Sequence, residues 1–162
     1  MAKSAPSTIV LKASATPHYE EFPLAPLDGC GNGAITPGML VETVAGEVRP
    51  HSTQGGNAER LFAIEGLNED ASSVTLGDID TDYDDDNCAV KVWFAQPGDL
   101  VYALLVAGGS VSAEGLLQSA SDGYLMAYTA AAQLPEKLIA RATETVDNSA
   151  GTSAVRVRAR VI

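Results

Sequence analysis

An acidic run between residues 78 and 87 is the strongest polar signal in this sequence. Its alternate aspartates are Asp78, Asp80, Asp82 and Asp84. Carboxylates spaced in this way can present oxygen ligands to a hard cation such as calcium. The run does not match an EF-hand, because Tyr83 stands where a glycine is needed for the sharp turn and Ala89 where a bidentate glutamate is needed. The sequence therefore predicts a solvated, self-repelling loop and no firm metal site, with weak calcium binding by these four aspartates as the alternative.

The two histidines, His18 and His51, do not fall into a catalytic pattern. A serine hydrolase needs its serine beside a histidine base that a third group orients. The sequence contains neither a Gly-x-Ser-x-Gly nucleophile elbow nor a His/Cys cluster with the spacing of zinc ligands. We therefore predict that the protein is not an enzyme, has no catalytic residues and binds no cofactor. A hydrolase built around His51 and a nearby serine is the rival interpretation.

The two cysteines give little further chemistry. Cys30 lies between two glycines, and Cys88 follows the acidic run, where nearby negative charge raises the pKa of a thiol and weakens it as a nucleophile. Two cysteines can form one disulfide but do not make a disulfide framework. We predict simple unpaired thiols.

The charge of the chain limits its partners. It has 21 acidic and 10 basic residues, a formal net charge of -11, which argues against nucleic acid because phosphate binding needs clustered Lys and Arg. Three arginines alternate with aliphatic residues at the C-terminus; they are Arg156, Arg158 and Arg160. We predict that they pair with the chain's own carboxylates or face solvent, with an acidic partner as the alternative. No segment has the length to span a membrane and no signal peptide is visible, so we expect synthesis in the cytoplasm.

A short internal echo shows how the backbone is organised. Pro37-Gly38-Met39-Leu40-Val41 recurs as Pro97-Gly98-Asp99-Leu100-Val101. Proline sets the φ angle of the second position in a tight turn, and glycine supplies the positive φ that follows it. Each copy then reaches a second glycine turn, so each predicts a turn, a strand, another turn and a return strand.

Short apolar or alternating segments between such turns predict strands. The predicted strands are residues 39–44, 47–50, 89–94, 100–107, 116–119, 124–128, 138–145 and 155–162. Residues 58–66 are ambiguous between helix and strand, and residues 129–137 have room for one helical turn. Short strands at this spacing, without helical runs between them, predict an all-β fold, a small β-barrel or β-sandwich.

The first 34 residues differ from the rest, because four prolines exclude a continuous helix there. Residues 7–14 predict one strand, and the segment 1–34 is interpreted as an extended N-terminal arm preceding a domain at 35–162. Two interpretations of this segment stay open: a frayed terminus, or an arm that orders on a neighbouring subunit because its apolar side chains are costly to leave in water. The candidate partner-binding residues are Ile9, Val10, Leu11 and Phe22 in the arm, Trp93 as core or interface anchor, and Arg156, Arg158 and Arg160.

The order of these segments resembles a known family. The ordered set is Ile35-Thr36-Pro37-Gly38-Met39-Leu40-Val41, Ala58-Glu59-Arg60-Leu61-Phe62-Ala63-Ile64-Glu65, Pro97-Gly98-Asp99-Leu100-Val101-Tyr102, Gly115-Leu116-Leu117, Gly123-Tyr124-Leu125 and Val146-Asp147-Asn148, followed by the Val-Arg-Val-Arg ending. Over about residues 35–162 the chain is similar to the head decoration, or capsid cement, proteins of tailed bacteriophages.

The resemblance implies a β-rich viral structural protein without catalytic residues. It implies binding to the major capsid protein on the outer surface of an assembled shell, and so a place on the virion. It also implies a homo-oligomer on the shell, with a trimer favoured and a dimer possible. The alternative is a calcium-dependent adhesin or carbohydrate-binding module that uses the Asp-rich loop.

Overall fold

The computed structural model describes residues 5–26, 34–70, 73–84, 88–129 and 137–162. The regular structure in these ranges consists of β-strands, and no α-helix occurs among them. The prediction of a small all-β barrel fold is therefore confirmed. Residues 130–136, which hold most of the predicted helical turn, lie outside the described residues, as does Cys30.

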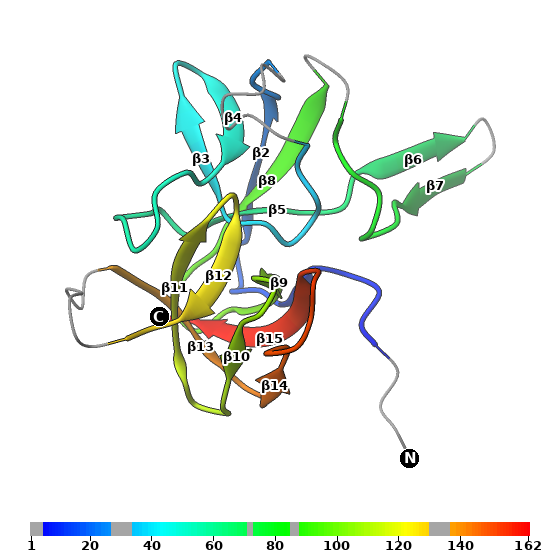
Figure 1. Cartoon of the computed structure of the whole chain (residues 1–162). Coiled ribbons are helices and arrows are strands. Elements are labelled where there is room, and N and C mark those ends of the chain that lie inside the picture. The colour runs from blue at the N-terminus through cyan, green and yellow to red at the C-terminus, as the bar shows by residue number, and fades with distance from the viewer. Residues whose placement is uncertain (1–4, 27–33, 71–72, 85–87, 130–136) are drawn as a thin grey trace.

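Five strands close into a barrel in the lower half of Figure 1. Around the barrel they are β9 (Leu100–Leu105), β12 (Tyr124–Ala127), β11 (Leu116–Ser121), β13 (Leu138–Ala142) and β15 (Val155–Val161). The β9–β12 pairing is parallel and the other four are antiparallel. A closed barrel satisfies its backbone groups without leaving sheet edges.

The N-terminal segment is part of this body. β1 (Val10–Lys12) pairs antiparallel with β9, and β2 (His18–Pro23) pairs along its full length with β8 (Ala89–Phe94). Ile9 is completely buried. The described residues 5–26 are therefore not an extended arm, because their backbone and apolar side chains find partners within the same chain.

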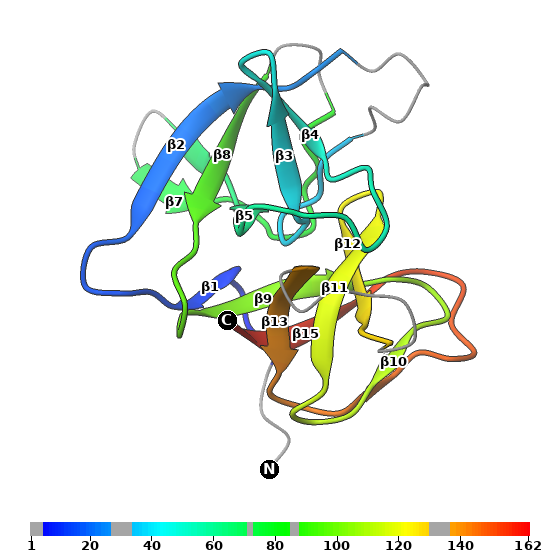
Figure 2. The same ribbon diagram turned by 90° about the vertical axis from the view of Figure 1, so that its left-hand side faces the viewer.

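A second layer of strands covers one end of the barrel (Figure 2). It contains the sheet β2-β8-β5, with β5 at Leu61–Ala63, and the hairpin of β3 (Val41–Val44) and β4 (Glu47–Pro50). Single bridges join the hairpin to both sides of the sheet, from Leu40 to Phe62 and from Leu24 to Val48. Residues 58–66, ambiguous from the sequence, thus contain a strand.

Two smaller pairings complete the fold. β6 (Leu67–Asp70) and β7 (Ser73–Leu76) form a hairpin that projects from the upper layer in Figure 1. β10 (Ser110–Val111) and β14 (Val146–Asp147) pair beside the barrel.

The sheet β2-β8-β5 separates two hydrophobic cores. Successive side chains of a strand point to opposite faces, and in β5 and β8 side chains on both faces are buried. Phe62 and Trp93, directly paired across β5 and β8, join the barrel core. Leu61, Ala63, Val90 and Val92 join the second core under the hairpin. Each fully buried large apolar side chain contributes about 1.5–3 kcal/mol, so this shared sheet holds the two layers together as one body.

Candidate functional site

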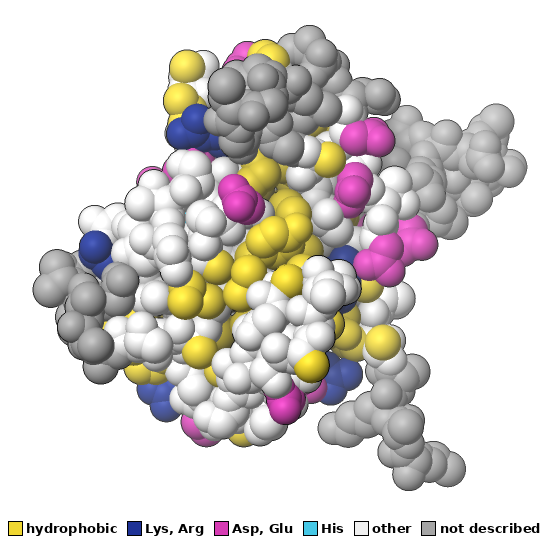
Figure 3. Space-filling view, in the orientation of Figure 1, with side chains coloured by type: hydrophobic (Ala, Val, Ile, Leu, Met, Phe, Trp, Pro, Cys, Tyr) yellow, Lys and Arg dark blue, Asp and Glu magenta, His cyan; other side chains and the backbone are white. Residues whose placement is uncertain are grey.

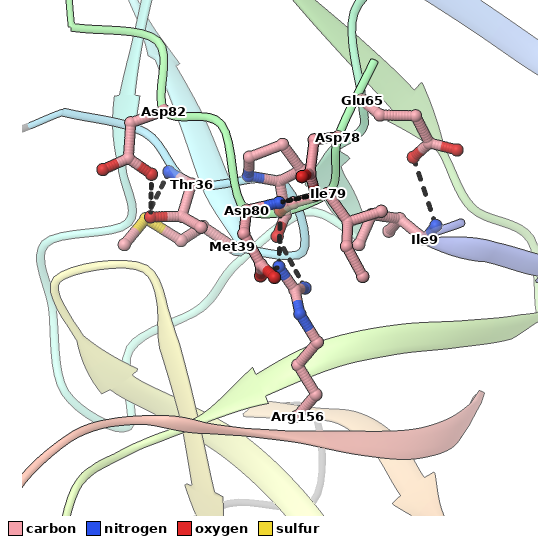
Figure 4. A network of polar contacts seen from close by, with 10 residues as sticks. Ile9, Thr36, Met39, Glu65, Asp78, Ile79, Asp80, Asp82 and Arg156 are labelled. Atoms are coloured by element: carbon pink, nitrogen blue, oxygen red, sulfur yellow. Dashed lines mark hydrogen bonds and ion pairs between the residues drawn. The ribbon is translucent and has the colours of Figure 1, made fainter. Parts of the chain in front are cut away.

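The acidic loop is fastened to the barrel by Arg156 of β15 (Figure 4). One guanidinium nitrogen, Nη1, donates to the carbonyl oxygen of Pro37 at 2.9 Å. The other, Nη2, donates to the carbonyl oxygen of Ile79 at 2.5 Å and to Oδ1 of Asp80 at 2.9 Å. Only 11% of the Arg156 side chain is exposed. Arg156 therefore joins the last strand of the barrel, the first Pro-Gly turn and the acidic loop.

The aspartates of the loop face separate partners. Asp78 Oδ1 accepts from the backbone N–H of Asp80 at 3.0 Å, and Asp82 Oδ1 accepts from the hydroxyl of Thr36 at 2.7 Å, while Asp80 binds Arg156. Asp84 is exposed. Among the described residues no three His, Cys, Asp or Glu side chains converge as metal ligands do. Asp78, Asp80 and Asp82 thus each bind a different partner, and nothing in the geometry of the four aspartates favours the calcium alternative.

The other two arginines of the last strand differ from Arg156. Arg158 lies 3.7 Å from a carboxylate oxygen of Glu144, whose other oxygen accepts from the Arg158 backbone N–H at 2.9 Å. Arg160 is exposed. The strand alternates as predicted, since Val157, Ala159 and Val161 are buried. Pairing with the chain's own carboxylates is confirmed for Arg156 and Arg158.

A second polar cluster surrounds His51, which is 2% exposed. Its Nδ1 lies 2.8 Å from the hydroxyl oxygen of Ser119 on β11, and its Nε2 lies 3.1 Å from the carbonyl oxygen of Asn57. A carbonyl can only accept, so Nε2 carries the proton and Nδ1 accepts from the Ser119 hydroxyl. A carboxylate oxygen of Glu42 lies 3.9 Å from Nε2.

Glu42 is itself held by neighbours. Its Oε1 accepts from Arg49 Nε and from the Ser52 hydroxyl, each at 2.8 Å. Burial opposes ionisation, but the hydrogen bonds from Ser52 and Arg49 and the nearby His51 and Arg49 lower the pKa of Glu42 overall. The shallow cavity beside it has a volume of about 210 Å³ and is lined by Glu42, Thr43, His51, Asn57, Ala58, Glu59 and Leu61.

The His51 cluster contains the elements of a serine hydrolase without the access that one needs. Ser119 is completely buried and does not line the cavity, so its hydroxyl cannot meet a substrate there. The Ser119–His51 contact instead fastens the loop after β4 to the barrel strand β11. Sequence reasoning missed Ser119, since 68 residues separate it from His51 and no motif connects them.

A shallow hollow of hydroxyl groups lies at the β10–β14 pairing. Its volume is about 360 Å³, and its lining is Ser110, Val111, Ser112, Thr145, Val146, Asp147 and Ser149. Both the backbone N–H and the hydroxyl of Ser149 donate to Asp147 Oδ1, at 3.0 and 2.7 Å, and these bonds lower the pKa of the Asp147 carboxyl. The Asp147 carboxylate, which a carbohydrate-binding module could use here to bind a sugar, therefore already has local donors.

The candidate partner-binding side chains lie at different depths. Ile9 and Trp93 are completely buried in the barrel core, so they are core residues and offer no surface to a partner. Val10, Leu11 and Phe22 are half-buried, and Phe22 packs against the second core. Among the side chains that the structure describes, the exposed large apolar ones are Tyr19 at 40% and Val44 at 44%. The sequence did not single out these two, because neither lies in a distinctive apolar pattern.

The face shown in Figure 3 carries separate acidic side chains and a strip of apolar side chains that runs down its middle.

No helix in the described ranges is long and apolar enough to cross a membrane. Comparison of the sequence with protein-family models and with curated proteins finds no match.

Proposed function

We propose that this protein is a capsid decoration protein: it binds the outer surface of an assembled shell of a tailed bacteriophage and stabilises it. The observation that carries the proposal is the way in which the segments of the resemblance pack together. The backbone N–H of Gly38 donates to the carbonyl of Ala63 at 2.7 Å, and a Cβ on Gly38 would lie only 2.9 Å from the carbonyl oxygen of Tyr102. The three longest matching segments thus meet at one junction, as expected if their order reflects a shared framework.

The use of the polar side chains supports a structural role. Arg156, His51 and the buried Glu65 all connect distant segments; Glu65 accepts from the Thr8 hydroxyl and from the Ile9 backbone N–H at 3.1 Å. The hydroxyl that contacts His51, that of Ser119, is buried and so is not open to a substrate. Groups that elsewhere perform catalysis serve here to hold strands together.

The pairing of β1 and β15 supports slow unfolding of the protein. β1 and β15 both pair with β9, so the first and last strands are held on the same barrel strand. β15 is one of the five barrel strands, so it cannot separate from β9 without opening the barrel. Slow unfolding of this kind suits a protein on a particle, where lifetime matters more than equilibrium stability.

We also propose that the protein acts as an oligomer on the shell, with a trimer favoured. Several weak contacts to one lattice reinforce each other, because each contact after the first is intramolecular. Binding only to the assembled lattice then stabilises that lattice by mass action.

Cryo-electron microscopy of mature heads tests the proposal. Purified protein is added to heads that lack it, and heads without addition serve as the control. We expect density of barrel shape at regular positions on the outer surface, grouped in threes, and heads that release DNA at a higher temperature. Heads that carry no added density and release DNA at an unchanged temperature would rule the function out.

A further inference from the structure

β2 is an edge strand with an unused row of backbone groups. Its one sheet partner is β8, and in Figure 2 it lies at the outer side of the upper layer. Four of its residues, His18 to Glu21, are exposed, with half-buried Phe22 and exposed Pro23 after them. An edge strand of this kind is where another chain can add a strand.

The register shows which groups point outward. The backbone N–H of Leu24 donates to the carbonyl of Cys88 at 2.9 Å, so Leu24 and Cys88 are a hydrogen-bonded pair. Hydrogen-bonded pairs alternate with non-bonded pairs along an antiparallel ladder. Phe22, Glu20 and His18 therefore bond to β8, while Tyr19, Glu21 and Pro23 direct their backbone groups away from it. Proline has no N–H, and beyond it the outer edge is taken by β4: Leu24 bridges to Val48, and the Ala25 N–H donates to the Val48 carbonyl at 2.8 Å. The free outer edge therefore offers the N–H and carbonyl groups of Tyr19 and Glu21.

The opposite edge of β8 agrees with this assignment. There the backbone N–H of Ile64 donates to Lys91 at 2.9 Å and that of Ala95 donates to Arg60 at 3.0 Å. Lys91 and Ala95 thus bond toward β5, which leaves Val90, Val92 and Phe94 to bond toward β2. Among the described residues, no backbone bond uses the outward groups of Tyr19 and Glu21.

The side chains of the edge determine what can bind there. Glu20 and Glu21 put a carboxylate on each face of the strand, on a chain whose net charge is -11. His18 pairs with Glu20 at 2.7 Å, and the Lys91 ammonium lies 5.6 Å from the centre of the exposed Tyr19 ring. Like charges on adjacent strands repel, whereas opposite charges attract. The edge therefore disfavours pairing with a second copy of itself and favours a positively charged strand.

We propose that the outer edge of β2 binds an extended, positively charged segment of another protein by strand addition. The added strand bonds to the backbone of Tyr19 and Glu21, and its Lys or Arg side chains lie against Glu20 and Glu21. Pro23 ends the row of donors and so limits the length of the added strand. This inference does not depend on the proposed capsid function.

Two capped octapeptides test the proposal by titration and by amide NMR. One alternates Lys and Val, and the other alternates Glu and Val. We expect the Lys peptide to bind at least about tenfold more tightly, with shifted and slowly exchanging amides at Tyr19 and Glu21. Equal binding of both peptides, no binding of the Lys peptide, or shifts confined to another surface would overturn the proposal.

Three variants separate backbone from charge. Glu21→Pro removes an outward N–H and no bond to β8, so it should weaken binding by about tenfold. The double variant Glu20→Gln/Glu21→Gln keeps both donors and should weaken binding by about fivefold, with a shallower salt dependence. Glu114→Gln removes one charge from the β10–β11 turn of the barrel and should bind as the unchanged protein does. If Glu21→Pro folds and binds normally, or if it misfolds and the double variant binds normally, the proposal is wrong.

Discussion

The two Pro-Gly turns have nearly the same backbone and very different surroundings. Gly38 has a φ of +96° and Gly98 of +97°. In each turn the residue after glycine donates its N–H to the residue before proline, Met39 to Thr36 and Asp99 to Gln96, both at 3.0 Å. Each glycine N–H also donates to a carbonyl of a neighbouring strand segment, at 2.7 and 2.8 Å. The repeated Pro-Gly sequence thus has the same local backbone structure in both places.

The residue after each glycine shows the first difference. Asp99 returns to its own turn and accepts from the Gln96 backbone N–H at 2.8 Å through Oδ2. Met39 takes the same position in the first turn, where its sulfur lies 3.4 Å from the Thr36 nitrogen. A thioether is a weak acceptor. The second turn therefore closes itself strongly, while the first depends on other parts of the molecule.

The space around the glycines shows the second difference. A Cβ on Gly38 would lie 2.8 Å from Arg156 Nη1 and 2.9 Å from the carbonyl oxygen of Tyr102, whereas a Cβ on Gly98 would meet nothing within 4 Å. One turn is packed into the junction of the two layers and the other is open. The same local motif is therefore part of the interior in one place and a surface feature in the other.

Exchanging each glycine for alanine tests this difference most directly. Both variants carry the strain of a positive φ, about 1–2 kcal/mol. Gly38→Ala must also displace the Tyr102 backbone and Arg156, so we expect a total loss of about 3 kcal/mol. Urea unfolding followed by the fluorescence of Trp93, the single tryptophan, measures both. Equal losses in the two variants would show that the surroundings of Gly38 do not matter.

Removing the Arg156 side chain, which donates a hydrogen bond to the first Pro-Gly turn, should have the next largest effect on the free energy of unfolding. Arg156→Met leaves the carbonyls of Pro37 and Ile79 without their donor, and we expect a loss of about 1–3 kcal/mol in the same measurement. The matched control is Arg158→Met, which removes only a half-exposed ion pair and should cost under about 1 kcal/mol. A loss from Arg156→Met no greater than that of the control would contradict the role of Arg156 as a fastening.

Tyr83 gives a pH-dependent form of the same test. It exchanges backbone hydrogen bonds with Ile35, close to the first turn, and its hydroxyl donates to the Ile64 carbonyl at 2.8 Å. Burial, reinforced by the charges of Cys88, Glu65 and Glu21, raises the pKa of Tyr83 to about 12 from its usual 10. The folded form keeps its proton longer than the unfolded form. The stabilisation is thus fully present below pH 10 and lost between about pH 10 and pH 12.

We therefore expect Tyr83→Phe to be less stable by about 1 kcal/mol near pH 8, because the Ile64 carbonyl loses its donor. Between pH 10 and pH 11.5 its stability should fall less steeply than that of the unchanged protein. Tyr19 and Tyr124, whose pKa values burial also raises, remain in both proteins and supply the residual slope. Urea unfolding at several pH values measures this, and identical slopes would show that Tyr83 is not the titrating group.

The strands and turns were the part of the fold that local patterns could predict. Alternation in β15, the turn at residues 121–123 and both Pro-Gly turns follow from the preferences of neighbouring residues. β2 was missed because Pro17 precedes it, Pro23 ends it and its exposed residues give no apolar pattern. It is a strand because β8 supplies partners for its backbone, which is a tertiary effect.

The polar contacts could not be predicted in this way. Arg156 meets Pro37 across 119 residues and His51 meets Ser119 across 68. Alternation showed that the Arg156 side chain leaves the barrel, but not that the acidic loop folds over it. The apolar residues of the N-terminal segment were read as available to a partner for the same reason. Their partners lie in β9 and β8, which are far away in the sequence.

The smallest expected effect comes from the second pair of turns in the echo, where the difference is one of residue type. In the first copy both Ala45 and Gly46 have positive φ, +54° and +87°, whereas in the other copy only Gly108, the counterpart of Gly46, does, at +72°. Alanine is strained in this region, and Asn-Gly is the preferred sequence for a two-residue hairpin turn. Ala45→Asn should therefore stabilise the protein by about 0.5–1 kcal/mol, while Gly108→Ala should destabilise it by about 1 kcal/mol. A Cβ added at Gly108 would meet nothing within 4 Å, so Gly108→Ala measures backbone strain without a packing clash. Urea unfolding of both variants measures it, and opposite signs would show that the strain at Ala45 is intrinsic to the turn.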